Sequence, residues 1–147
     1  MGTPKGCNPA GQAASADSAT YHYVLDVGPL EQMYTQQQNQ ANHPTTGEVM
    51  IGGEMSMASG PDARHMEVHI CYLSNGDVVD ASTPPSLTLT DATTGNSQDV
   101  PVSTMEGVTE GEADLHYGNN VSITPGDHYE VTVVLKGEQV TMSFTGS

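Results

Sequence analysis

The sequence predicts an all-β sandwich, and three observations support this fold class. Short stretches with alternating apolar residues recur along the chain, turns rich in Gly, Pro and Asn separate them, and no segment keeps the 3.6-residue apolar period of an amphipathic helix. With 147 residues, the chain has the common size of a single domain. We therefore expect a flexible leader over residues 1–20 and one β-sandwich domain over residues 21–147.

Each expected strand has a local signal. The stretch YHYVLDV (21–27) alternates apolar and polar residues, and EVMIGGEMSM (48–57) contains a Gly pair that predicts a bulge or a tight bend. An Asn-Gly hairpin signal, SNGD, follows the stretch RHMEVHICYL. In chain order, we expect strands at 21–27, 48–57, 64–73, 86–104 (two strands joined by a turn at TTGN), 115–123, 128–135 and 139–144. The polar segment 35–47, which contains His43, is expected to be a mobile loop.

The leader is rich in Gly, Ala, Ser and Pro, a composition whose burial cannot offset the entropy of ordering. It has no hydrophobic signal core, so we expect any export signal to have been removed. Cys7 lies where an exported lipoprotein would carry its lipid. The other cysteine, Cys71, falls in an expected strand, and we expect no disulfide between the two.

The charge of the chain excludes some partners. Lys and Arg number 3 against 18 Asp and Glu, so the formal net charge is −15. Nucleic-acid binding and docking on anionic lipid both require a basic surface. A negative electrostatic field attracts cations and cationic partners. The alternative interpretation is that the acidic surface only keeps the protein soluble.

The stretch RHMEVHICYL (64–73) combines an apolar face with a face of metal-ligand types. Read as a strand, it places His65, Glu67, His69 and Cys71 on one side and Met66, Val68, Ile70 and Tyr72 on the other. The second set is an ordinary core face. The first is either a solvated face or part of a cation site.

Other ligand-type residues lie elsewhere along the chain. His116 begins an expected strand in LHYGNNVSI, and Met105 precedes it by eleven residues, across an acidic loop. Met55 and Met57 lie shortly before His65. Imidazole, thioether and carboxylate together suit copper, whereas the cysteine pairs of a structural zinc site and the oxygen ladder of a calcium loop are both absent from the sequence.

These motifs resemble a known family. From about Val24 to Leu135, through VLDVGPLEQM, GEMSM, HMEVHICYL, SLTLTDATTG, VPVSTM, LHYGNNVSI and GDHYEVTV, the chain resembles the small periplasmic iron-uptake proteins that bind copper and are encoded beside Ftr-type iron permeases. The resemblance implies an immunoglobulin-like or cupredoxin-like antiparallel β-sandwich that forms a homodimer. It also implies a Cu²⁺ site and a role in iron uptake at the cell envelope, in the periplasm or at the cell surface, with an inner-membrane iron permease as a partner.

Matched by motif, the resemblance assigns the copper ligands to His65, Glu67, Met105 and His116. The family also uses a histidine nearer the carboxyl end, and the late histidine here, His128, does not match that position. The segment between Met105 and His116 is longer than in the family. His69, Met57, Met55 and His128 are therefore further candidate ligands, and iron or manganese are alternative ions. Cys71 is expected to be a buried thiol that binds no metal.

The sequence is compatible with three functions. The first is a metal-binding envelope protein without enzymatic activity beyond metal redox. The second is a structural or adhesive β-sandwich whose histidines and methionines bind nothing. The third is a copper-dependent enzyme that consumes superoxide, for which Arg64 is the one nearby cationic residue in the sequence. No Ser-His-Asp, paired-carboxylate or Gly-rich phosphate-binding pattern points to another enzyme.

Overall fold

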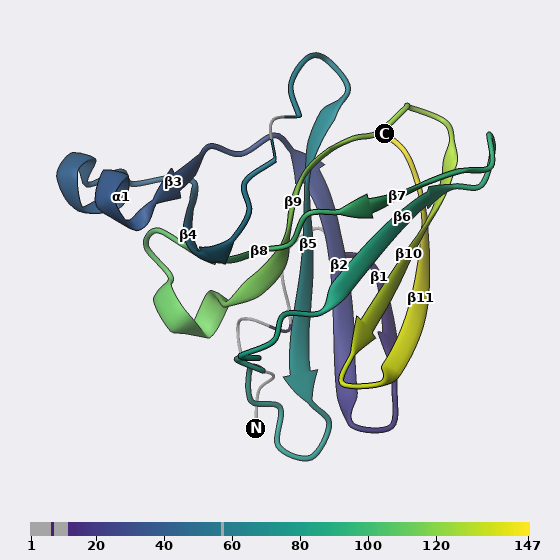
Figure 1. Ribbon diagram of the computed structural model, residues 1–147, viewed down its shortest axis with the longest axis horizontal. Helices are drawn as coiled ribbons and strands as arrows, with labels where there is room; N and C mark the ends of the chain where they lie inside the picture. Colours follow the sequence, from purple (N-terminus) through teal and green to yellow (C-terminus); the bar gives the residue numbers. More distant parts are fainter. Residues whose placement is uncertain (1–6, 8–11, 57) are drawn as a thin grey trace.

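Two β-sheets form the protein in the computed structural model, which describes residue 7, residues 12–56 and residues 58–147 (Figure 1). The larger sheet contains, in spatial order, β1 (Gln12–Asp17), β2 (Tyr21–Pro29), β5 (Ala63–Tyr72), β9 (His116–Ser122), β8 (Ser103–Gly107), β4 (Glu48–Gly53) and β3 (Met33–Thr35). The smaller sheet contains β11 (Glu138–Thr145), β10 (His128–Leu135), β6 (Ser86–Asp91) and β7 (Asn96–Val100). The predicted all-β sandwich is confirmed. Neighbouring strands are antiparallel, as expected, except β3 and β4, which pair in parallel.

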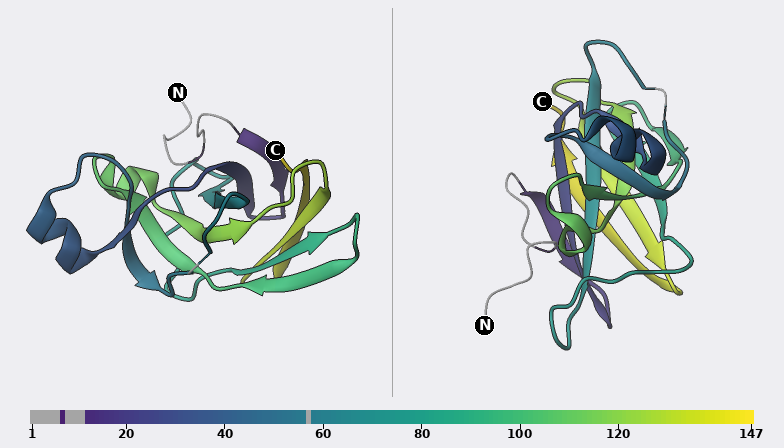
Figure 2. Two further views of the ribbon diagram at one scale, coloured as in Figure 1. Left: turned by 90° about the horizontal axis from the view of Figure 1, so that it is seen from above. Right: turned by 90° about the vertical axis from the view of Figure 1, so that its left-hand side faces the viewer.

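The two sheets lie against one another (Figure 2), and the apolar side chains between them form the core. The larger sheet contributes alternate residues of β2 and β5, and these include the predicted core face of β5: Met66, Val68 and Ile70. Alternate residues of β6 and β10, such as Leu89 and Val131, face them from the smaller sheet. The period of two in the sequence therefore predicted correctly which face of β5 is buried in the core.

The opposite face of β5 is buried as well, which the sequence did not predict. His65, Glu67 and His69 have exposed fractions of 2%, 8% and 0%. This face is turned away from the smaller sheet, and the register places it beside Asn120 and Gly118 of β9. Polar side chains are therefore enclosed on one side of the same strand that builds the apolar core on the other.

A helix, α1 (Gln36–Asn42), replaces most of the mobile loop expected at 35–47. Thr35 and Gln38 form a capping box, in which the Gln38 N–H donates to the Thr35 hydroxyl and the Thr35 N–H donates to the Gln38 side chain. None of the helix residues is buried, so α1 has no apolar stripe for a periodicity analysis to detect. In the described part of the chain, the helices are too short and too polar to cross a lipid bilayer.

The amino-terminal region differs from the expected leader in two respects. Residues 12–17 form β1, which pairs with β2 at the edge of the larger sheet. Cys7 is buried and forms a disulfide with Cys71, which corrects the expectation of two unpaired cysteines and of a free Cys71 thiol. This disulfide uses the sulfur that a lipid anchor at Cys7 would need. For residues 1–6 and 8–11, the leader expectation lies outside the described residues.

Candidate metal centre

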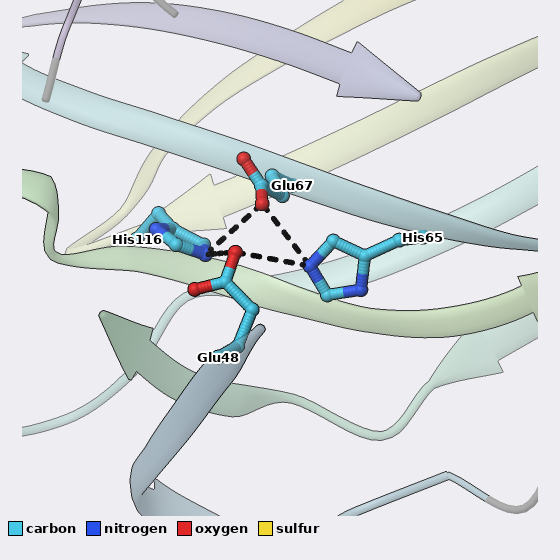
Figure 3. Close-up of side chains that lie close together, drawn as sticks. All are labelled: Glu48, His65, Glu67 and His116. Carbon is cyan, nitrogen blue, oxygen red and sulfur yellow. Dashed lines mark ion pairs between the residues drawn. The ribbon is translucent and has the colours of Figure 1, made fainter. Parts of the chain in front are cut away.

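Four buried side chains from three strands converge on one point (Figure 3). They are Glu48 at the start of β4, His65 and Glu67 on β5, and His116 at the start of β9. We call this group the primary centre. One ligand atom from each residue lies within 4.8 Å of the others, so this buried group could hold a metal ion.

The facing atoms of the primary centre are two imidazole nitrogens and two carboxylate oxygens. His65 Nε2 lies 3.1 Å from Glu67 Oε1 and 3.5 Å from Glu48 Oε1. His116 Nε2 lies 3.3 Å and 3.2 Å from the same two oxygens. Each nitrogen thus faces both carboxylates, so the four atoms surround a common point at which an ion could be held.

Strand register explains this convergence. His65 and Glu67 are two residues apart on β5 and therefore share a face. Continuing the antiparallel register of β5 with β9 places His116 on that face, one strand away. Gly118 permits the close approach, because a Cβ at this position would collide with the carbonyl oxygen of Met66.

Hydrogen bonds outside the primary centre fix the orientation of both histidines. The Nδ1–H of His65 donates to Asn120 Oδ1 at 2.7 Å, and the Nδ1–H of His116 donates to the carbonyl oxygen of Asp114. A neutral imidazole that donates through Nδ1 keeps its lone pair on Nε2. Once the Nε2 protons are lost, both lone pairs therefore point at the primary centre, as in metal sites where an outer partner orients each histidine ligand.

Several buried polar atoms of the primary centre have no hydrogen-bond partner among the described residues. They are His65 Nε2, His116 Nε2 and Glu48 Oε2. Because an unpaired buried polar group costs about 1–3 kcal/mol, native proteins pair nearly all of them. Ligation to an ion would satisfy both nitrogens at once.

The carboxylates dominate the electrostatics of the primary centre. Burial by itself lowers the pKa of His65, but Glu48 and Glu67 outweigh it and raise that pKa to about 10. Burial also lowers the pKa of His116, but Glu48 and Glu67 again outweigh it and raise that pKa to about 9. Burial raises the pKa of Glu67, but His65 and His69 reverse this and hold it below its usual range. Without metal, protons therefore take the place of the cation.

Two further carboxylates lie at the mouth of the primary centre. Glu31 Oε2 is 3.3 Å from His65 Nε2, and the Glu31 side chain is 40% exposed. Burial first, and then Glu48 and Glu67, raise the pKa of Glu31 to about 7, although His65 opposes this. Burial and Glu67 raise the pKa of Asp26 to about 6. Both residues line a cavity of about 450 Å³ that reaches Glu48 and Glu67, so the way in from solvent is acidic.

Met105 lies beside the primary centre. It is fully buried and stands directly opposite His116 in the pairing of β8 with β9, so the two side chains share a face. Met50 of β4 stands opposite Met105 in turn. The structure thus brings together His65, Glu67 and His116 and puts the fourth predicted ligand, Met105, next to them.

The further candidates are placed differently. His69 is fully buried, and its Nε2–H donates to Glu67 Oε2 at 2.9 Å, so it supports a ligand of the primary centre. His128 is exposed at the start of β10 in the other sheet, beside Thr145, and the fold does not bring it to the primary centre of the same chain. Met55 follows β4, in a segment whose backbone is hydrogen-bonded to the Asn119 side chain. Asn119 lies on the core-facing side of β9, away from the primary centre. Met57 lies outside the described residues.

Sequence reasoning missed Glu48, Glu31 and Asn120. Glu48 lies on β4 and Glu31 lies in the segment before β3. These segments approach β5 and β9 only because of the order of the strands in the larger sheet, which the sequence does not reveal locally. The one local signal was the sequence GEVM, in which a lone glutamate begins a predicted strand.

Comparisons of this chain with protein-family models, with curated proteins and with solved structures find no match. The case for a function therefore depends on the geometry and chemistry of the primary centre.

Proposed function

We propose that this chain is a copper-binding protein that holds Cu²⁺ at Glu48, His65, Glu67 and His116. The observation that carries the proposal is the pair of buried imidazole nitrogens, each oriented by an outer hydrogen bond and each facing both carboxylates. A purely structural polar cluster would be expected to pair its own donors and acceptors. Here His65 Nε2 and His116 Nε2 form ion pairs with both carboxylates but make no well-aligned hydrogen bond within the described chain, which disfavours the structural or adhesive alternative.

Copper is favoured over other ions by the mixed ligand types. Imidazole binds both copper states, carboxylate suits Cu²⁺, and the thioether of Met105 beside His116 suits Cu⁺. Manganese and iron prefer oxygen-rich sites, and Glu31 at the mouth gives the site a third carboxylate. If the protein bound Mn²⁺ or Fe²⁺ in preference to Cu²⁺ when both were present, the primary centre would be assigned to the harder ion.

The wider role that we propose is metal handling for iron uptake at the cell envelope, by a homodimer with an immunoglobulin-like or cupredoxin-like fold and an iron permease as partner. The motif resemblance supports this role, and two features agree with it. The Cys7–Cys71 disulfide suits an oxidising compartment such as the periplasm or the cell surface. The net charge of −15 and the acidic cavity favour capture of cations.

A superoxide-consuming enzyme is less well supported. Arg64, the proposed guiding cation, precedes His65 on β5 and therefore faces the opposite side of the sheet. Its guanidinium donates to the carbonyl oxygens of Pro61, Ala63 and Ser147. It does not face the primary centre.

Copper titration of metal-free protein tests the proposal. We expect at least one tightly bound Cu²⁺ per chain, measured calorimetrically against a competing chelator, and a loss of affinity of about tenfold or more in His65→Ala. His128→Ala is the matched control, because that histidine is exposed in the other sheet, and its affinity should equal that of the wild type. Absence of tight copper binding, or equal affinity in both variants, would overturn the proposal.

A further inference from the structure

A second group of ligand-type side chains shares His116 with the primary centre. One ring nitrogen of His69, one of His116 and a carboxylate oxygen of Asp114 lie within 4.8 Å of one another. Asp114 Oδ2 is 3.7 Å from His116 Nδ1, whereas His116 Nε2 faces Glu48 and Glu67. His116 thus has one ring nitrogen turned to each group.

His69 supplies a buried nitrogen for this second group. Its Nε2 is 2.9 Å from Glu67 Oε2, and in the tautomer that donates through Nε2 the lone pair lies on Nδ1. Nδ1 is buried and has no hydrogen-bond partner in the described part of the molecule. The rings of His69 and His116 lie side by side, with centroids 4.6 Å apart and planes inclined by 32°. A ligand type that suits copper and zinc is therefore present without a partner.

Asp114 connects the second group to solvent. It ends the 3₁₀ turn Gly111–Asp114, its side chain is 22% exposed, and it lines the same acidic cavity as Glu48 and Glu67. The N–H of Gly107 donates to Asp114 Oδ2 at 2.8 Å and holds the carboxylate in place. An ion that reaches the primary centre through this cavity also passes Asp114.

We propose that the protein binds a second divalent ion, copper or zinc, at His69, Asp114 and His116, with His116 as an imidazolate bridge between the two ions. This inference rests on the proposed function, because it extends the primary centre. The second ion displaces the Nδ1 proton of His116, which is released to solvent, and replaces the hydrogen bond from that nitrogen to the carbonyl oxygen of Asp114. Three carboxylates (Glu48, Glu67, Asp114) and one imidazolate carry four negative charges, which balance two divalent cations.

Native mass spectrometry of metal-free protein titrated with Zn²⁺ provides the test. The wild type should bind two ions per chain, and Asp114→Asn should keep the first ion within about threefold of its affinity while binding the second at least about tenfold more weakly. Asparagine keeps an oxygen for the Gly107 N–H, so the turn should persist. Glu112→Gln, which alters an exposed carboxylate of the same turn, is the matched control and should bind both ions.

A second measurement uses Cu²⁺ and does not depend on a variant. Because an imidazolate bridge couples two Cu²⁺ ions antiferromagnetically, the electron paramagnetic resonance signal should rise with the first equivalent and fall as the second is added. Binding of one ion by the wild type, lost in His65→Ala, would overturn the second site and leave the proposed function standing. Two ions bound equally by Asp114→Asn, or two uncoupled coppers, would also overturn the second site. Absence of any tightly bound ion would overturn both proposals.

Discussion

The two faces of β5 are buried to a similar degree but by opposite chemistry. On one face, Met66, Val68 and Ile70 pack into the core between the sheets. On the other, His65, Glu67 and His69 are enclosed together with His116 and Glu48. Burial of apolar surface stabilises the fold by about 25 cal/mol per Å², whereas burial of unpaired polar groups opposes it.

The apolar face of β5 stabilises the fold, whereas the polar face forms the candidate binding site. The apolar face needs nothing beyond the chain itself to be satisfied. The polar face leaves nitrogen lone pairs aimed at a common point, so it is completed by protons or by a metal ion. A buried polar cluster of this kind is better explained by binding than by stability. Replacing buried ion pairs with apolar side chains of similar volume often leaves stability unchanged or raises it.

Truncation on the apolar face should give the largest effect on folding. We expect Ile70→Ala to lower the free energy of unfolding by about 2–5 kcal/mol, because it removes fully buried methyl groups and leaves a cavity. Urea denaturation of the metal-free protein measures this. Copper affinity of the folded variant should stay within about twofold of the wild type, and a parallel loss of affinity would show that the two faces are not separable.

Neutralisation of one carboxylate on the polar face should reduce binding. Glu48→Gln keeps the shape of the side chain but removes a negative charge 3.2–3.5 Å from both ring nitrogens, so copper affinity should fall about tenfold or more. Glu130→Gln, an exposed change on the other sheet, is the control for net charge. Equal affinities in the two variants would remove Glu48 from the ligand set.

In the metal-free protein, the polar face should make the free energy of unfolding depend on pH. The pKa values of His65 and His116, about 10 and about 9, are raised above the ordinary value of 6.5. Their contribution to the free energy of unfolding is therefore complete below about pH 6.5 and is lost as the pH rises through 9 to 10. Denaturation of metal-free protein across pH 6–10 should show this decline, and the double variant His65→Gln/His116→Gln should lack it. Copper affinity should rise over the same range, because the metal displaces these protons.

The smallest effect is expected at the mouth of the primary centre. Glu31 is partly exposed, so Glu31→Gln should slow copper association by about threefold and change the equilibrium affinity less. Stopped-flow measurements at low and high salt would reveal the change, with a larger difference at low salt. Gln32, its neighbour, offers the control Gln32→Glu, which adds charge outside the cavity lining. An unchanged association rate in Glu31→Gln would show that ions reach the primary centre by another path.

The sequence predicted what local periodicity determines. Alternation along 64–73 separated Met66 from His65 and Glu67 correctly, and the Gly52–Gly53 interruption coincides with an irregular register between β4 and β8. Sheet order was not accessible in this way. Glu48 reaches His65 because β4 joins β8, which in turn joins β9, and no local pattern encodes that arrangement.

Two further features needed information that periodicity lacks. The Cys7–Cys71 disulfide spans 64 residues of sequence and depends on how the amino-terminal segment returns to the polar face of β5. The helix α1 has no buried residue, so its only sequence signal was the Thr35–Gln38 capping box. Elements without an apolar stripe, and contacts between distant segments, are where the sequence-based expectations were wrong or incomplete.

A copper-soaked crystal, examined by anomalous scattering at the copper absorption edge, tests the central claim most directly. We predict a strong peak about 2.0–2.1 Å from both His65 Nε2 and His116 Nε2, the distance at which an imidazole nitrogen binds such an ion, with Glu67 and Glu48 completing the ligand set. No peak at this position, or peaks confined to exposed residues such as His128, would contradict it.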